Sequence, residues 1–170
     1  MKIADMHGDT IYELLTRRRA GKEVFLRENQ LHMDLQKMKK ADYLLQNFAL
    51  FVELKEDVNP YEEAKAEYAV FVEELEKNND LISQVFTYED IEKNRKAGKI
   101  SALLTLEEGE VCLGQIEKLE EFYSYGARMM TLAWNFDNSL TTCNTKCAPP
   151  ESRNYKGSRF DWNGPVISAK

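Results

Sequence analysis

Short apolar runs alternate along the chain with longer segments in which hydrophobic residues recur every three or four positions. The short runs predict strands at residues 3–6, 45–52, 100–106 and 129–134, with a further possible strand at 81–86. The longer segments predict helices at residues 11–19, 61–78, 88–97 and 115–125. This alternation, with strands that are apolar on both faces, predicts an α/β fold built on a parallel sheet.

Two architectures fit this order, a doubly wound sheet or part of a (β/α)8 barrel. The first strand is expected to be buried. No glycine-rich phosphate loop follows it, because Gly8 stands alone, so nucleotide binding has little support. Residues 31–38 predict a short helix or turn.

Several helix ends carry recognisable signals. Thr10 is the expected N-cap of the first helix, and Thr87 with Asp90 predicts an N-cap before residue 88. Gly98 and Gly126 are the expected stops of the helices before them. The helix at 61–78 is expected to expose six glutamates to solvent: Glu62, Glu63, Glu67, Glu73, Glu74 and Glu76.

Composition describes an ordinary globular chain of 170 residues, enough for one domain with a sizeable core. A net charge of −6 argues against nucleic acid as a partner, since phosphates require a basic face. No apolar run approaches the roughly 20 residues that span a bilayer, and the polar N-terminus has no signal-peptide core. The chain is therefore expected to be cytoplasmic, without a membrane partner.

Three cysteines, an odd number, favour reduced thiols over a disulfide framework. Cys143 and Cys147 have a C-x3-C spacing that suits a metal, but no second Cys or His pair lies near them in sequence. We interpret both as ordinary thiols, and Cys112 as a small packing residue.

Candidate chemistry gathers where the predicted strands end. His7 and Asp9 follow the first strand, Glu107 ends the strand at 100–106, and Trp134 and Asn135 close the last one. Parallel strands bring their carboxyl ends to one rim, where ligands and catalytic groups collect. Imidazole and carboxylate groups bind zinc, and a carboxylate can bridge two metal ions. The rim is therefore a candidate metal site.

A structural interpretation of the same residues stays open at this point. His7 fits a buried histidine with satisfied hydrogen bonds, and Asp9 fits a cap of the first helix. Glu107 and Glu108 fit caps of the helix that follows their strand. Spacing alone does not decide between this interpretation and a metal site.

Three ordered segments resemble the renal (membrane) dipeptidase family of zinc metallopeptidases. Residues 4–10 read A-D-M-H-G-D-T and resemble its opening motif, D-x-H-x-D; residues 99–107 read K-I-S-A-L-L-T-L-E and resemble the strand that ends in a metal-bridging glutamate. Residues 125–135 read Y-G-A-R-M-M-T-L-A-W-N and resemble its G-x-R-x-x-T-L-T-H/W-N motif. Residues 32–35 and 47–52 are also similar to the family. The resemblance covers residues 1–138, and residues 139–170 form an irregular polar tail outside it.

The resemblance implies about half of a (β/α)8 barrel and hydrolysis of dipeptides by a metal-bound hydroxide at a zinc centre. By position, His7 and Asp9 would bind one zinc ion, while Glu107 would bridge two ions and serve catalysis. Trp134 and Asn135 would contact the substrate. His32, with its own His-x-Asp sequence, falls outside the metal-binding motif and is interpreted as structural.

Four departures from the family pattern qualify this picture. Trp134 stands where the animal enzymes have a substrate-contacting histidine, and Glu108 stands where the family usually has glycine. The chain has no histidine after His32, although two later histidines hold the family's second zinc, and it ends at Lys170, short of the roughly 250 residues of such a barrel. We expect a truncated, N-terminal half with an incomplete second zinc site. The alternative is an inactive half-barrel that acts in assembly and self-associates through its open edge.

Overall fold

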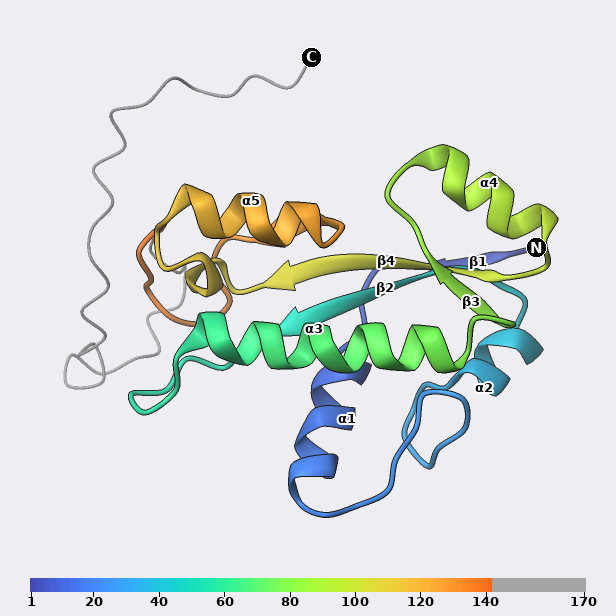
Figure 1. Ribbon diagram of the computed structural model, residues 1–170, viewed down its shortest axis with the longest axis horizontal. Helices are drawn as coiled ribbons and strands as arrows, with labels where there is room; N and C mark the ends of the chain where they lie inside the picture. The colour runs from blue at the N-terminus through green and yellow to red at the C-terminus, as the bar shows by residue number, and fades with distance from the viewer. Residues whose placement is uncertain (142–170) are drawn as a thin grey trace.

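Residues 1–141, which the computed structural model describes, form one parallel sheet with helices packed on it (Figure 1). The strands are β1 (Ile3–Asp5), β2 (Tyr43–Phe51), β3 (Ile82–Gln84), β4 (Ile100–Glu107) and β5 (Ala127–Thr131). The helices are α1 (Thr10–Arg19), α2 (Leu35–Lys40), α3 (Pro60–Lys77), α4 (Tyr88–Lys96) and α5 (Ile116–Ser124), with a short 3-10 turn η1 (Gly109–Cys112) after β4. The predicted α/β class with parallel strands is confirmed.

Strand order decides between the two architectures that the sequence left open. The order β1-β2-β4 follows the chain, and β5 continues it by pairing with the second half of β4. The short β3 lies on the same edge of β4 as β5, opposite its first residues. A doubly wound sheet reverses its order at a switch point, whereas β1, β2, β4 and β5 follow one another in one direction, as barrel strands do. Among residues 1–141, the short β3 is the strand that departs from this order.

The two outer strands differ from the inner ones in burial. β2 and β4 are buried along most of their length, but β1 is largely exposed, so the expected burial of the first strand is wrong. β1 pairs only with β2 in the described part of the chain, which leaves its other edge uncovered. β5 also exposes alternate residues, and it ends at Thr131 rather than at residue 134.

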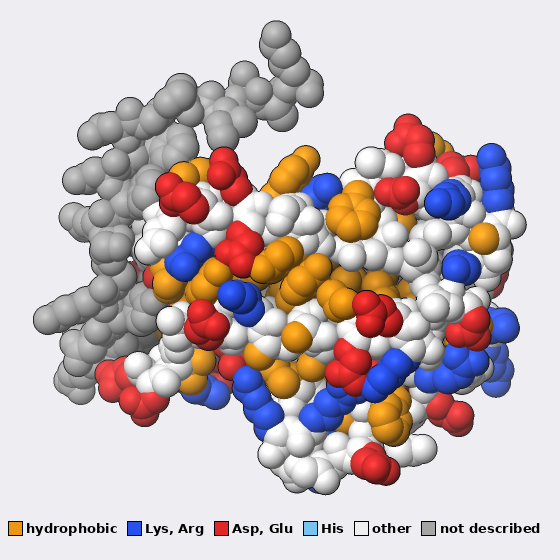
Figure 2. All heavy atoms as spheres, viewed as in Figure 1, with side chains coloured by type: hydrophobic (Ala, Val, Ile, Leu, Met, Phe, Trp, Pro, Cys, Tyr) orange, Lys and Arg blue, Asp and Glu red, His pale blue; other side chains and the backbone are white. Residues whose placement is uncertain are grey.

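The core lies between the sheet and the helices that cross it. In Figure 1, α3 runs in front of β2 and β4, with α1 below it and α4 and α5 above. Phe48 on β2 and Phe71 on α3 meet edge to face at 5.8 Å between ring centroids, and both are fully buried. Figure 2 shows further hydrophobic side chains in the band between α3 and the two upper helices.

Helix ends follow the sequence signals with one exception. Thr87 and Asp90 form the predicted capping box, and Gly98 and Gly126 both adopt positive φ just after their helices. The exception is Thr10, which is the first residue of α1 and not its N-cap; Asp9 holds that position.

Two of the six glutamates expected on a solvated face are fully buried, so that prediction is wrong for Glu67 and Glu74. Glu67 accepts a hydrogen bond from the backbone N–H of Phe51 at 3.0 Å, and Glu74 accepts one from that of Leu26 at 2.7 Å. Glu74 also pairs with the guanidinium of Arg18. α3 packs on α1 as well as on the sheet. Glu67 satisfies a main-chain donor at the end of β2, and Glu74 satisfies one in the loop after α1.

The cysteine predictions are tested at one position. Cys112 is buried as expected, and burial raises the pKa of its thiol to about 11. Cys143 and Cys147 lie outside the described residues, as does most of the predicted tail at 139–170. Within residues 1–141, no helix has the length and apolar character needed to cross a membrane.

Candidate metal centre

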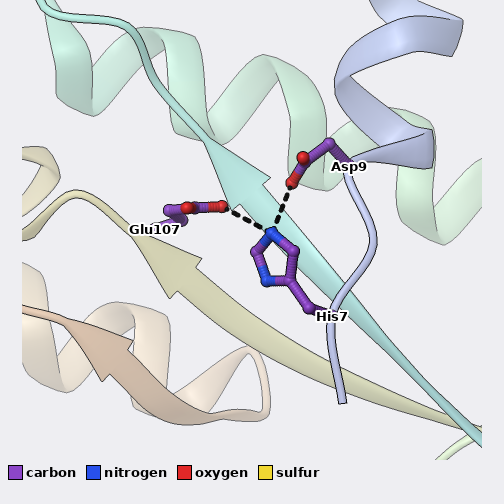
Figure 3. A group of neighbouring side chains, drawn as sticks. All are labelled: His7, Asp9 and Glu107. Carbon is purple, nitrogen blue, oxygen red and sulfur yellow. Dashed lines mark ion pairs between the residues drawn. The ribbon is translucent and has the colours of Figure 1, made fainter. Parts of the chain in front are cut away.

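The side chains of His7, Asp9 and Glu107 converge at the carboxyl end of the sheet (Figure 3). The imidazole Nε2 of His7 lies 3.2 Å from Oδ1 of Asp9 and 3.1 Å from Oε2 of Glu107. One potential ligand atom from each residue lies within 4.8 Å of the others. His7 comes from the loop after β1, Asp9 from the start of α1 and Glu107 from the last position of β4. The structure therefore brings all three predicted metal ligands together.

Backbone contacts fix the loop that carries His7. The main-chain oxygen of Met6 accepts a hydrogen bond from the side-chain amide of Asn47 at 2.6 Å, and that of Gly8 accepts one from the N–H of Ala49 at 3.1 Å. A Cβ at Gly8 would lie 2.9 Å from the side-chain nitrogen of Gln46, so a larger residue there would require the Gln46 side chain to shift. The loop is thus held against the middle of β2.

The donor set fits a divalent cation. Oδ1 of Asp9 and Oε2 of Glu107 are buried, and neither accepts a hydrogen bond from the described residues. Buried carboxylate oxygens normally have partners, because leaving them unsatisfied costs free energy. One imidazole nitrogen and two carboxylate oxygens are ligands that zinc accepts, and three protein ligands leave a coordination position open.

Electrostatics at Glu107 point to a shortage of positive charge. Burial raises the pKa of Glu107, the imidazole of His7 lowers it, and the neighbouring carboxylate of Asp9 raises it again. The net direction is upward. Two carboxylates at a half-buried position share one imidazole, so a cation between them would favour the charged form of both.

The structural interpretation of these residues holds only for Glu108. Asp9 sits at the N-cap of α1, but its side chain caps no backbone N–H among residues 1–141. The side chain of His7 is 53% exposed, unlike a buried core histidine. Glu108, by contrast, caps η1 by accepting a hydrogen bond from the N–H of Glu110.

The second His-x-Asp sequence is placed elsewhere. His32 is exposed, and its companion Asp34 caps α2 by accepting the N–H of Lys37 at 2.8 Å. Asp34 also pairs with the ammonium group of Lys37. Burial acts to raise the pKa of Asp34, but the bonds from Lys37 and a further one from the N–H of Asn29 outweigh burial, so the pKa is lowered. Its carboxylate is therefore occupied in building the loop before α2.

Trp134 and Asn135 follow β5 on the segment that faces the end of β2. The Trp134 ring packs edge to face on Phe51 at 4.9 Å between centroids, and Phe51 is opposite Glu107 in the sheet register. Tyr12 also packs edge to face on Phe51, at 5.2 Å between centroids. This aromatic row of Tyr12, Phe51 and Trp134 was not predicted, because its members come from three separate elements.

A second missed feature is the polar pair Asn47 and Thr105. The Thr105 hydroxyl donates to the side-chain oxygen of Asn47 at 2.8 Å, and both residues are buried. A signal was present in the sequence, since each is a polar residue inside a largely apolar strand. Such a residue needs a buried hydrogen-bond partner, and here the Thr105 hydroxyl is the donor and the Asn47 oxygen is the acceptor.

Comparison with known proteins places this chain in a family. The family model of membrane dipeptidases, peptidase family M19, matches residues 1–158. This chain belongs to the membrane dipeptidase family. The match runs past residue 138, where the sequence analysis ended the resemblance. The division of the chain into two parts at residue 138 stays a prediction. An uncharacterized dipeptidase of Schizosaccharomyces pombe is 31% identical over 156 residues, which is 83% of this chain and 38% of that protein.

Solved structures of family members share the fold. A metallopeptidase from Rhodobacter sphaeroides, liganded with a phosphinate mimic of the dipeptide L-Ala-D-Ala, superposes with a TM-score of 0.70 at 18% identity. The superposition covers 83% of this chain and 49% of that structure. The dipeptidase AC, of family M19, superposes with a TM-score of 0.68 at 19% identity, over 79% of this chain and 43% of that structure. This member of the family thus spans less than half the length of these relatives, and its sheet corresponds to about half of their barrel-type fold.

Proposed function

We propose that this chain contributes the first half of a metal-dependent dipeptidase centre, in which His7, Asp9 and Glu107 hold zinc. The observation that carries the proposal is the convergence of three ligand atoms, two of them buried carboxylate oxygens without hydrogen-bond donors among the described residues. Membership of the family supports the reaction class, hydrolysis of dipeptides.

The residues of this chain have distinct roles in that centre. His7 supplies the neutral nitrogen ligand, and Asp9 supplies a carboxylate from the first turn of α1. Glu107, the catalytic residue in this proposal, has a second carboxylate oxygen with which to hold a further ion. A bound zinc ion would polarise the scissile carbonyl and lower the pKa of water.

The second metal position is incomplete in this sequence. Apart from His7, the chain has one other histidine, His32, and that residue is exposed and lies outside the cluster. We therefore propose that this chain binds one zinc ion firmly and that a second ion needs ligands from outside these residues.

The substrate side of the centre is the segment with Trp134 and Asn135. The aromatic row lies beside the end of β4 and offers an apolar surface for a side chain of a bound dipeptide. L-Ala-D-Ala is the first dipeptide to test, because a family member of the same fold has been solved with a mimic of it. The cytoplasmic location stays a prediction.

The deciding experiment measures zinc content of the purified chain together with hydrolysis of L-Ala-D-Ala in added zinc. Bound zinc that is lost in Asp9→Asn, with an unchanged circular dichroism spectrum, supports the centre. Turnover by the wild type would extend the proposal to a working dipeptidase. Zinc content that is equal in the wild type and in Asp9→Asn would overturn the assignment.

Self-association is a second proposal, and it rests on the open edge of the sheet. Beside β5 lies an apolar groove lined by Leu106, Ile116, Leu119, Tyr123, Met129 and Met130. Several of these side chains are exposed, and β5 pairs only with β4 in residues 1–141. Sedimentation velocity over a range of protein concentrations tests it, with a concentration-dependent dimer as the expected result. The alternative of an inactive assembly piece is not favoured by the comparisons.

A further inference from the structure

Glu108 has a backbone conformation that its side chain does not favour. Its φ is +105°, a region in which residues other than glycine are rare, and its side chain is fully buried. Glycine, which has no Cβ, needs no compensation for such a φ. A non-glycine residue persists in this conformation when surrounding contacts over-determine it, and such positions cluster at functional sites.

Those contacts run to the segment after β5. One carboxylate oxygen of Glu108 accepts a hydrogen bond from the backbone N–H of Trp134 at 3.2 Å. The other accepts the N–H of Glu110 at 3.1 Å and the side-chain amide of Asn138. The buried carboxylate thus has three donors, which offset the cost of removing it from water.

The main chain beside Glu108 lies equally close to that segment. The N–H of Gly109 donates to the main-chain oxygen of Leu132 at 3.3 Å, and a Cβ on Gly109 would lie 2.7 Å from the same oxygen. The end of β4 and the residues after β5 are therefore in direct contact. Glu108 is the side chain that joins this contact to Trp134.

We propose that Glu108 is a positioning residue that fixes Trp134 as the apolar wall of the substrate site. The hydrogen bond from the Trp134 N–H fixes the position of the Trp134 main chain, and from there the indole ring packs on Phe51. Phe51 is opposite Glu107 in the sheet. The wall suits the apolar side chain of a dipeptide, and in this respect the inference rests on the proposed function. The positioning itself is independent of zinc.

Tryptophan fluorescence measures this positioning directly. The chain has two tryptophans, Trp134 and Trp162, so a Trp162→Phe background isolates the emission of Trp134. In that background we expect Glu108→Ala to shift the emission to longer wavelength and to increase quenching by acrylamide. Glu117→Ala is the matched control, because it removes the same charge from an exposed position on α5 and should change neither.

A second substitution separates the carboxylate from the backbone strain. Glu108→Gly also removes the carboxylate, but it relieves the positive φ. We expect Glu108→Gly to melt at a higher temperature than Glu108→Ala and to show the same shifted emission. If the alanine variant does not fold, the glycine variant can be measured in its place. Wild-type emission and quenching in a folded Glu108→Ala or Glu108→Gly variant would overturn the proposal.

Zinc binding, measured on the same samples, distinguishes this inference from the proposed function. If the wild type binds no zinc, the dipeptidase proposal fails, while a shifted Trp134 emission in Glu108→Ala still supports the positioning role. If the wild type turns over dipeptide, we expect Glu108→Ala to raise KM more than it lowers kcat. An unchanged KM with unchanged emission would contradict the role.

Discussion

The side-chain amide of Asn47 on β2 donates a hydrogen bond to the main-chain oxygen of Met6, the residue before His7, at 2.6 Å. Thr105 on β4 donates its hydroxyl to the side-chain oxygen of the same asparagine at 2.8 Å. β4 also carries Glu107, two positions further along. Two hydrogen bonds, one buried and one partly buried, therefore connect the strand of one proposed ligand to the loop of another, and they position the proposed metal centre from outside it.

Replacing Thr105 with valine tests this connection. Valine has a similar shape but no hydroxyl, so the side-chain oxygen of Asn47 loses a donor inside the core. We expect the free energy of unfolding to fall by about 1–3 kcal/mol. Zinc affinity should fall by about 10- to 100-fold, as for other groups that orient metal ligands. Urea unfolding and a zinc titration measure the two effects.

Thr105→Ser is the matched control for that variant. Serine keeps the hydroxyl donor and removes only a methyl group, so zinc affinity should stay close to that of the wild type. A valine variant that binds zinc as tightly as the serine variant would show that the loop is held without this connection.

The two histidines of the chain provide a second test, because only one belongs to the cluster. Glutamine at position 7 removes the imidazole ligand, and we expect zinc affinity to fall by at least about 100-fold, the upper end for residues that merely support a ligand. His32→Gln changes the same residue type at an exposed position and should leave zinc affinity unchanged. Calorimetric titration of both variants compares them. Equal losses would indicate binding that is not specific to the cluster.

The sequence predicted the order of elements well because the central strands are apolar on both faces. β2 and β4 are such strands, and their runs differ clearly from the helical spacing around them. The exposure of β1 could not be predicted in the same way. A short apolar run looks the same at the edge of a sheet and at its centre, and only the pairing partners decide its burial.

The proximity of the proposed ligands could be predicted because chain order alone brings them together, while their role as a metal site stays a prediction. Parallel strands that end on one rim place His7 near Glu107, whatever the details of packing. Glu67 and Glu74 were misjudged because helical periodicity does not show which main-chain donors a glutamate will meet, here the N–H groups of Phe51 and Leu26. The positive φ of Glu108 was also not predicted, because a glutamate rarely adopts it.

The buried position of Glu74 leads to a prediction on stability. Glu74→Ala would leave the N–H of Leu26 and the guanidinium of Arg18 without their shared buried acceptor. Arg18 keeps its bonds to Glu73 and to the main-chain oxygen of Val24, so the main cost is the unsatisfied N–H of Leu26, and we expect the free energy of unfolding to fall by about 1–3 kcal/mol. Glu76→Ala, on an exposed position of the same helix, should change stability by less than about 0.5 kcal/mol. Chemical denaturation measures both, and equal effects would contradict the burial of Glu74.

Glu67 adds a prediction on pH dependence. The pKa of Glu67 is raised well above the ordinary value of 4.5, mainly by burial and further by the charges of Glu63 and Asp9. The hydrogen bond from the N–H of Phe51 and the charge of Arg19 act in the opposite direction but do not cancel this rise. Its second oxygen, Oε1, is buried and has no hydrogen-bond partner in residues 1–141. The folded protein therefore holds this proton more tightly than the unfolded chain does.

The sign of the effect follows from that difference. Between the unfolded pKa and the raised folded pKa, the folded state binds more protons, so its stability falls as the pH rises. Glu67→Gln keeps an acceptor for Phe51 and removes the titration. We expect the metal-free variant to melt at a higher temperature than the wild type at about pH 8, with the difference shrinking toward about pH 4.5. Glu62→Gln, an exposed position on the same helix, should leave the wild-type pH dependence in place. Melting curves of Glu67→Gln that stay parallel to those of the wild type across this range would show that Glu67 is charged in the folded protein.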